Sequence, residues 1–196
     1  MVCCVTGHRP KGFPFNRERM NNPYDKYLHI LREAVEDLVD NGCVHFISGM
    51  AYGADLDFAD MVLDYKAADK EIVLEAAFPY PVDLTKLFLD IDNEKTLILR
   101  YCDYINFVSS HYYRGCMQAR NRYMVDKSDI VLAIWNEKYD GGTWNTIKYA
   151  RSKGKMIRYI IISEDGAEYT RNYERWKLGK KGQSMDKAAR GCSDPQ

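Results

Sequence analysis

Several features that would decide the class of this protein at once are missing from its sequence. No uninterrupted apolar run among its 196 residues comes near the ~20 residues that a membrane-spanning helix needs, and no positively charged signal region precedes the first apolar run. The 28 Lys and Arg residues balance 28 Asp and Glu residues, so the whole chain offers no field that attracts nucleic acid or an anionic membrane. We therefore expect a cytoplasmic protein without a membrane partner, and nucleic acid is not favoured as a partner.

Cysteine pairs and histidine clusters with the spacing of metal ligands are also missing. The six cysteines include no Cys-x-x-Cys pair, and Cys3, Cys4 and Cys43 lie in or beside apolar runs. Reduced, buried thiols fit this pattern better than a disulfide framework or a zinc site. The four histidines do not follow metal-ligand spacing either. We expect neither a metal nor a cofactor.

Two well-known phosphate-binding motifs are absent as well. Gly-x-Gly-x-x-Gly, which dinucleotide-binding domains carry after their first strand, does not occur there. The loop Gly-x-x-x-x-Gly-Lys-Ser/Thr of many nucleotide hydrolases does not occur at all. Classical NAD binding and ATP hydrolysis therefore lack their usual support.

What the chain does contain is an alternation of apolar runs and helical patterns. Continuous apolar runs, without a polar residue at every second position, are typical of parallel strands that are covered on both faces. The segments between these runs carry helical periodicity, including one expected helical region over 83–101. The pattern predicts an α/β fold: a single Rossmann-like domain with a mostly parallel sheet and helices on both faces. Strands are expected over residues 2–6, 44–48, 71–78, 104–109, 130–135 and 156–162.

The regular alternation ends near residue 162. We expect the domain to cover residues 1–162, followed by a C-terminal extension over 163–196 with a short helix around Tyr169 to Leu178. From about residue 179 the extension is rich in Gly, Ser, Lys and Asp, which predicts disorder. Six basic residues from Arg175 to Arg190 accompany one acid. A solvated run of charge is preferred there over a nucleic-acid contact.

Two glycine-rich turns are the most informative feature that is present. The first glycine turn, Ser48–Asp55, and the second glycine turn, Asp140–Thr143, each follow an apolar run and each open a helical segment. In an α/β sheet this order places backbone N–H groups and a helix N-terminus at the carboxyl edge, where hydrogen bonds and the helix dipole favour an anion. The two turns together predict a phosphorylated ligand.

Polar side chains are expected at the same edge. Thr6–Pro10 ends the first strand, and Arg120 lies on a later helix; an arginine can pair with a phosphate through two hydrogen bonds. Asp55 is expected either to accept hydrogen bonds from ribose hydroxyls of the ligand or to stabilise the N-terminus of its own helix. A general-base role for Asp55 or Asp57 is less favoured, because acids are common in the first turn of a helix. The residues predicted to bind the ligand are Gly7, His8, Arg9, Ser48, Gly49, Gly53, Asp55, Arg120, Asn121, Gly141, Gly142 and Thr143.

Together these motifs resemble the YpsA-like family. The resemblance rests on four segments and covers roughly residues 1–162; the segments are Thr6–Pro10, Gly49–Asp55, Arg120–Asp126 and Gly141–Thr143. The family belongs to the Rossmann-like SLOG superfamily, which also contains the Lonely Guy phosphoribohydrolases and the DNA processing protein A domain. The resemblance implies a domain that binds a nucleotide or a nucleotide derivative. It implies no established reaction.

One position argues against phosphoribohydrolase chemistry. Those enzymes carry a glutamate three residues after the Gly-Thr pair, and this chain has Thr146 there, with Asn121 in place of their lysine. A threonine has no negative charge to stabilise an oxocarbenium-like ribose, so binding is favoured over catalysis and no catalytic residue is assigned. Three classes stay open: a ligand sensor or regulatory protein, which is preferred, a nucleotide-processing hydrolase, and a single-strand nucleic-acid binder. A homo-oligomer is left open.

Overall fold

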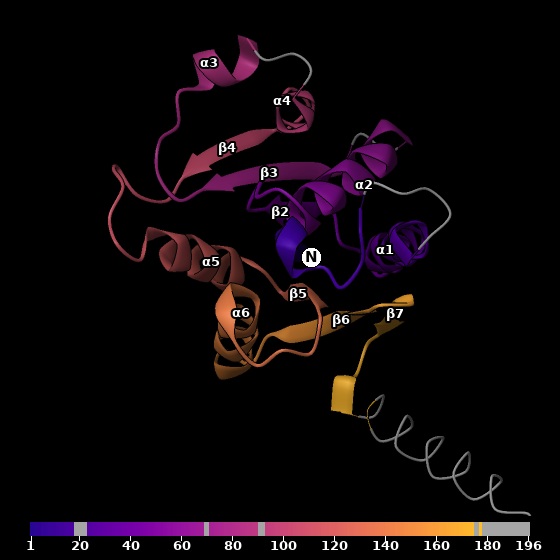
Figure 1. Cartoon of the computed structure of the whole chain (residues 1–196). Coiled ribbons are helices and arrows are strands. Elements are labelled where there is room, and N and C mark those ends of the chain that lie inside the picture. The colour runs from indigo at the N-terminus through magenta and orange to yellow at the C-terminus, as the bar shows by residue number, and fades with distance from the viewer. Residues whose placement is uncertain (18–22, 69–70, 90–92, 175–176, 178–196) are drawn as a thin grey trace, which may run out of the picture.

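The computed structural model shows one mostly parallel sheet between two layers of helices (Figure 1). It describes residues 1–17, 23–68, 71–89, 93–174 and 177. Across the sheet the strand order is β4-β3-β2-β1-β5-β6-β7, and every neighbouring pair is parallel except β6 with β7. The predicted α/β class is confirmed. The strands are β1 (Val2–Thr6), β2 (His45–Ser48), β3 (Val73–Phe78), β4 (Tyr104–Phe107), β5 (Ile130–Trp135), β6 (Met156–Ser163) and β7 (Gly166–Thr170).

The helices cover both faces of this sheet. Helices α1 (Pro23–Asp40) and α2 (Ala54–Ala68) pack together on one face, and α5 (Cys116–Lys127) and α6 (Gly141–Ser152) pack together on the other. A short turn of 3₁₀ helix, η1 (Pro10–Gly12), follows β1. No helix in the described part of the chain is long and apolar enough to cross a membrane.

The helical region expected over 83–101 consists of two short helices. They are α3 (Leu84–Leu89) and α4 (Glu94–Leu99), and α4 packs against α2. A new helix begins after Asn93 because the side chain of this residue accepts a hydrogen bond of 3.0 Å from the backbone N–H of Lys95. This is the N-cap arrangement that asparagine favours. It places Lys95 in the first turn of α4.

The strands are buried because both faces of the sheet are covered. All six residues of β5 are buried, which agrees with the continuous apolar runs in the sequence. The five described cysteines are free thiols, and Cys3, Cys4 and Cys43 are buried among the strands. Burial raises the pKa of the Cys4 thiol to about 12. Such a thiol stays protonated and packs as a small apolar side chain.

The sheet extends past the expected domain limit at residue 162. Strand β7 pairs with β6 through a turn at Glu164 and Asp165, so Tyr169 lies in a strand. The prediction of a helix beginning around Tyr169 was therefore wrong at that residue. Asp-Gly at 165–166 is a hairpin signal that the interpretation missed, because β7 is a half-exposed edge strand with few apolar residues. Beyond it, Tyr173 is buried against Trp135 and Tyr159. The disorder expected from about residue 179 lies outside the described residues, as does most of the basic run 175–190.

The strand order creates a switch point between β1 and β5. The chain leaves β1 for α1 on one face of the sheet and leaves β5 for α6 on the other face. A crevice therefore opens at the carboxyl ends of these two neighbouring strands, where ligands bind in open α/β sheets. Thr6–Arg9 and the second glycine turn both lie there.

Candidate functional site

A cavity of about 230 Å³ occupies the crevice at the switch point. We call it the switch-point cavity. Eight of the twelve predicted ligand residues line it: Gly7, His8, Arg9, Asp55, Arg120, Asn121, Gly142 and Thr143. The other four, Ser48, Gly49, Gly53 and Gly141, do not line it. Its remaining lining consists of Val5, Thr6, Ala51 and Met117. These four were not among the predicted ligand residues, although Thr6 and Ala51 belong to the segments expected at this edge.

Arg120 is the central buried cation of this cavity. It reaches the cavity from α5, and only 7% of its surface is exposed. One terminal nitrogen, Nη1, lies 3.4 Å from Oδ2 of Asp55 and 3.8 Å from the sulfur of Met124. The Nε atom is buried and has no hydrogen-bond partner within the described residues. Because a buried N–H without a partner is costly, the guanidinium is incompletely paired within the described residues.

The first glycine turn is filled by groups of the protein itself. Oδ2 of Asp55 accepts a hydrogen bond of 3.4 Å from the Ala51 N–H, in addition to its contact with Arg120. The Ser48 hydroxyl donates to the Asp55 carbonyl at 2.8 Å and accepts from the Met50 N–H at 3.1 Å. A Cβ on Gly49 would lie 1.2 Å from Nη1 of Arg120. Position 49 therefore requires glycine because Arg120 packs against it. The anion that occupies this turn is the carboxylate of Asp55.

Gly53 serves the contact between the first turn and β1. Its φ of +101° is in the left-handed region that glycine adopts readily. A Cβ at this position would lie 2.5 Å from the His8 carbonyl oxygen. The next residue, Ala54, donates its N–H to that same carbonyl at 3.1 Å. The N-terminus of α2 is thus joined to the loop after β1.

The second glycine turn, in contrast, is open. Helix α6 begins at Gly141, and the preceding Asp140 makes no side-chain hydrogen bond that caps the helix. A Cβ on Gly142 would meet no atom within 4 Å, and Gly142 is exposed. The Thr143 hydroxyl donates to the Gly7 carbonyl at 2.9 Å, which fixes the helix start against the end of β1. The first N–H groups of α6 can therefore receive an external acceptor.

Further charges surround the cavity. Arg9 is exposed, while Lys95 reaches the same region from α4. Burial raises the pKa of the Asp55 carboxyl, which the positive charges of Arg120 and Arg9 oppose. Burial, together with the same two arginines, lowers the pKa of Lys95, although Asp55 acts in the opposite direction. One carboxylate thus shares this space with three basic side chains, which favours an additional anion.

Lys95 gives no signal as a site residue in the sequence. It belongs to a short helix far from either glycine turn, and only the packing of α4 on α2 brings it to this edge. Its amine also lies 4.6 Å from the centre of the Tyr52 ring, in the first glycine turn. Position in the fold, rather than a motif, brings the charge of Lys95 near Asp55 and Arg120, although Lys95 lines neither hollow.

His8 and Asp57 have roles that the sequence did not specify. Nε2 of His8 accepts a hydrogen bond from the Asn136 N–H at 3.3 Å, and burial lowers the pKa of the imidazole. A neutral ring that joins β1 to the loop after β5 fits this geometry. Asp57 does not line the cavity; its carboxylate contacts Arg17 and the hydroxyls of Tyr24 and Tyr27. The geometry therefore leaves Asp57 without a route to a ligand in the cavity.

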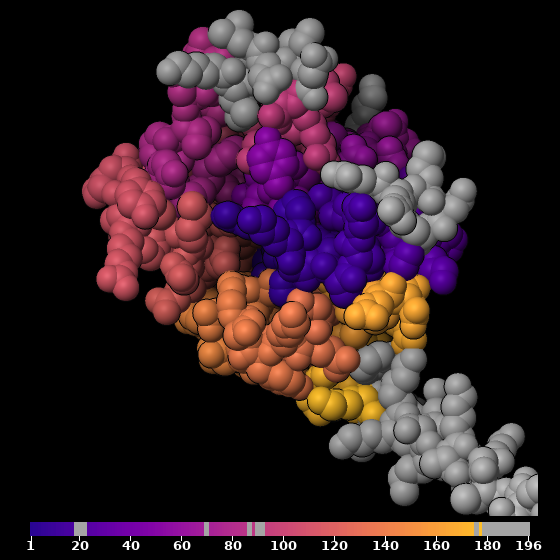
Figure 2. Space-filling model, in the orientation of Figure 1, coloured from indigo at the N-terminus to yellow at the C-terminus, as the bar shows by residue number. Residues whose placement is uncertain are grey.

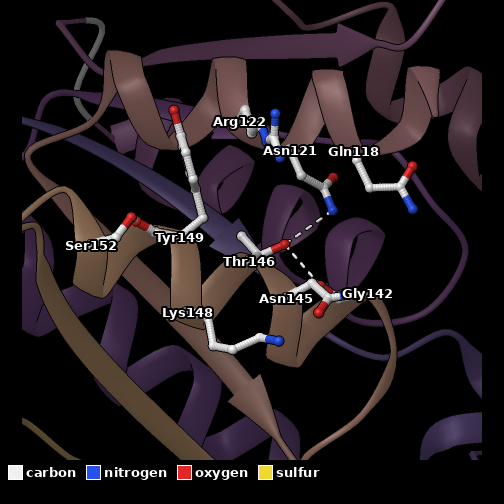
Figure 3. A pocket seen from close by; sticks show the side chains of 9 residues that line it. All are labelled: Gln118, Asn121, Arg122, Gly142, Asn145, Thr146, Lys148, Tyr149 and Ser152. Atoms are coloured by element: carbon white, nitrogen blue, oxygen red, sulfur yellow. Dashed lines mark hydrogen bonds between the residues drawn. The ribbon is translucent and has the colours of Figure 1, made fainter.

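A second hollow, the α5–α6 groove, adjoins the switch-point cavity, because Asn121 and Gly142 line both. Figure 3 shows the groove and the side chains that line it. Its volume is about 470 Å³. Thr146, which stands where phosphoribohydrolases have glutamate, lines this groove and not the cavity. Its hydroxyl donates to the Gly142 carbonyl at 2.9 Å and accepts from the Asn121 amide at 3.0 Å. The groove is lined by Gln118, Asn121, Arg122, Gly142, Asn145, Thr146, Lys148, Tyr149 and Ser152.

Chemically, the cavity offers hydrogen-bond donors and positive charge. Its one lining carboxylate, Asp55, is already engaged by Arg120 and by the Ala51 N–H. The part of the chain that the structure describes contains no group of three or more His, Cys, Asp or Glu residues arranged to hold a metal ion. The arrangement suits the binding of a phosphate or a similar anion.

Comparisons with known proteins agree with this architecture. A family model described as the YspA SLOG family (YpsA) matches residues 3–164. A UPF0398 protein of Bacillus thuringiensis (strain Al Hakam) is 22% identical over 161 residues, which cover 81% of this chain and 86% of that protein. A UPF0398 protein of Bacillus cereus (strain G9842) is 23% identical over 173 residues, covering 83% of this chain and 91% of that protein. SLOG membership is associated with a nucleotide-related ligand-binding fold. The family match spans the whole site, and the chain belongs to the YpsA family of SLOG proteins.

Proposed function

We propose that this protein binds a nucleotide-like phosphorylated ligand in the switch-point cavity. The phosphate would accept hydrogen bonds from the first N–H groups of α6 and from the guanidinium of Arg120. The observation that carries the proposal is the uncapped start of α6 beside a buried arginine whose Nε lacks a partner in the described chain. A helix N-terminus and a desolvated guanidinium both favour an anion, and they line the same cavity.

The surrounding charges and the family support the same ligand class. Arg9 and Lys95 add positive charge near Asp55, the only carboxylate that lines the cavity. Against the larger effect of burial, Arg9 acts to lower the pKa of Asp55, and Asp55 acts to raise the pKa of Lys95. The SLOG family is associated with nucleotide-related ligands. Together these observations favour a phosphate that is part of a nucleotide over an isolated carboxylate ligand.

Binding without turnover is the form of this function that we prefer. Phosphoribohydrolase chemistry needs a negative charge at the position of Thr146, and this side chain is neutral, buried and hydrogen-bonded on both sides. A protein that binds such a ligand without consuming it would act as a sensor or regulatory protein. Release of free base from adenosine 5′-monophosphate at ~1 per second or faster would contradict this choice.

The test compares two substitutions at one exposed glycine. Isothermal titration with adenosine 5′-monophosphate should detect binding to the parent protein. Gly142→Asp should weaken it at least tenfold, roughly the effect of one lost charged hydrogen bond, because its carboxylate faces the phosphate. Gly142→Ala is the matched control, since its Cβ meets no protein atom within 4 Å and adds no charge. Equal affinities for the parent and Gly142→Asp, or no binding of any nucleoside monophosphate at millimolar concentration, would overturn the proposal.

A further inference from the structure

The switch-point cavity is smaller than typical sites for small molecules. Its volume of about 230 Å³ lies below the roughly 300 to 1,000 Å³ of typical small-molecule sites. The α5–α6 groove, of about 470 Å³, adjoins it, and Asn121 and Gly142 line both hollows. A ligand whose phosphate lies at the start of α6 can therefore continue past Gly142 into the groove.

The groove is long and positively charged. Along α6 its lining runs from Gly142 to Ser152, which corresponds to about 15 Å of helix. It is lined by two cations, Arg122 from α5 and Lys148 from α6, and by no acidic side chain. Figure 3 shows the amine of Lys148 pointing toward the end of the groove where Gly142 and Asn145 lie.

The two cations contact aromatic rings rather than acids. The guanidinium carbon of Arg122 lies 5.4 Å from the centre of the Tyr149 ring, and the Lys148 amine lies 5.9 Å from that of Trp144. Within the described residues neither cation forms a salt bridge. Both charges remain available to a ligand. The amides of Gln118 and Asn145 add neutral donors along the same path.

From these observations we propose that the ligand carries two separate phosphate groups, one in the switch-point cavity and one in the α5–α6 groove beside Lys148 and Arg122. The ligand class is a nucleoside bisphosphate or a short linear dinucleotide, in which a sugar separates the phosphates. This inference rests on the proposed function, because the first phosphate occupies the site described above. The uncharged amides and Tyr149 would contact the sugar and base.

Two probes and one substitution series test the second phosphate. Adenosine 5′-monophosphate reports on the cavity. Adenosine 3′,5′-bisphosphate and the dinucleotide pApA add a second phosphate across the same ribose, as a free monoester in the first and as a diester that carries a further nucleoside in the second. In calorimetric titrations at least one of the two longer probes should bind about tenfold tighter than the monophosphate. Lys148→Gln should reduce that tenfold gain in affinity by a factor of about three to five, as expected for the loss of one exposed charge pair. Lys148→Gln combined with Arg122→Gln should remove nearly all of it.

The controls separate failure of this inference from failure of the proposed function. Each substitution should weaken the binding of the two-phosphate probes more than the binding of the monophosphate, and Lys148→Arg should restore the gain. Lys127→Gln removes the same charge from an exposed position at the end of α5 that does not line the groove, and it should have no effect. Monophosphate binding with no gain from a second phosphate, or a gain that survives both substitutions, overturns the inference alone. A protein that binds none of the three probes overturns the proposed function as well.

Discussion

The first and second glycine turns follow the same sequence logic, yet they differ in what occupies them. Each comes after a buried strand and opens a helix at the carboxyl edge of the sheet. The first holds its own anion, the carboxylate of Asp55, and Gly49 makes room for Arg120. The second leaves the start of α6 uncapped and the space around Gly142 empty. A glycine-rich turn therefore indicates that another group packs closely against the backbone. The sequence of the turn does not distinguish a ligand from a side chain of the protein itself.

The acids in the following helix explain the difference. The first turn of α2 contains Asp55 and Asp57, whereas the first turn of α6 contains no acidic residue. An acid at a helix start stabilises the helix and occupies the position that an external phosphate would take. Where no internal acid is present, the same backbone groups stay open to a ligand. Figure 2 shows the molecule from one side, with the orange segment of α6 at the surface and the indigo N-terminal segment beside it.

The largest expected effect is on stability, from adding one methyl group to the first turn. In Gly49→Ala the new Cβ would lie 1.2 Å from Nη1 of Arg120 and 2.6 Å from Oδ2 of Asp55, so the buried pair must separate. Breaking a buried ion pair costs about 3 to 5 kcal/mol. We expect the free energy of unfolding, measured with urea, to fall by that amount. In Gly142→Ala it should fall by less than about 1 kcal/mol or rise, because alanine favours helix over glycine.

The two glycines thus form an internally controlled pair. Both substitutions add the same atom to a turn at the same sheet edge, and only the surroundings differ. Equal losses of stability in the two variants would show that the first turn can admit a side chain, and the distinction between a filled and an open turn would fail.

A second prediction concerns pH and tests whether the acids of α2 are structural. Burial raises the pKa of Asp57 to about 6, against an ordinary value of 3.8, despite contacts with Arg17 and two tyrosine hydroxyls. The folded state then binds the Asp57 proton more tightly than the unfolded state does. Its contribution to stability is complete below about pH 4 and is lost as the pH rises through about 6. The difference in unfolding free energy between the parent and Asp57→Asn should therefore decrease by about 2 kcal/mol from pH 4 to pH 7.

The same variant distinguishes structure from binding. Asp57 lies outside the switch-point cavity, so Asp57→Asn should leave the affinity for adenosine 5′-monophosphate within about twofold of the parent. A stability difference that grows with pH would mean that Arg17 dominates over burial. A large loss of affinity would show that Asp57 contributes to ligand binding.

Much of this architecture could be predicted from the sequence, and the exceptions have physical causes. The strands of β1 to β6 were predictable because continuous apolar runs indicate parallel strands buried on both faces. The edge strand β7 was missed because only one residue of its five is buried, so its pattern is weak. Eight of the twelve expected site residues line the cavity because carboxyl strand ends and helix starts meet at one edge.

Contacts between distant segments could not be predicted in this way. Arg120 was expected to face a ligand, and nothing in the sequence revealed that it also fills the space above Gly49. The contribution of Lys95 depends on the packing of α4, and the position of Thr146 in the groove depends on the approach of α5 to α6. Spacing along one element predicts which residues share a face, whereas the distance between two elements depends on how their side chains pack.

The smallest expected effect sharpens the comparison most directly, because it tests whether the second turn is open. Asp140 precedes α6 without capping it through its side chain, so Asp140→Ala should change the free energy of unfolding by less than about 0.5 kcal/mol, well below the ~1 kcal/mol that loss of a working cap to alanine costs. The substitution also removes a negative charge near the proposed phosphate. The affinity for adenosine 5′-monophosphate should therefore rise about two- to threefold, more at low ionic strength than at high, because salt screens charges at exposed positions. Urea unfolding and titration calorimetry on the same variant check both expectations. A stability loss above about 1 kcal/mol would mean that Asp140 caps α6 in solution, and the second turn would then be filled like the first.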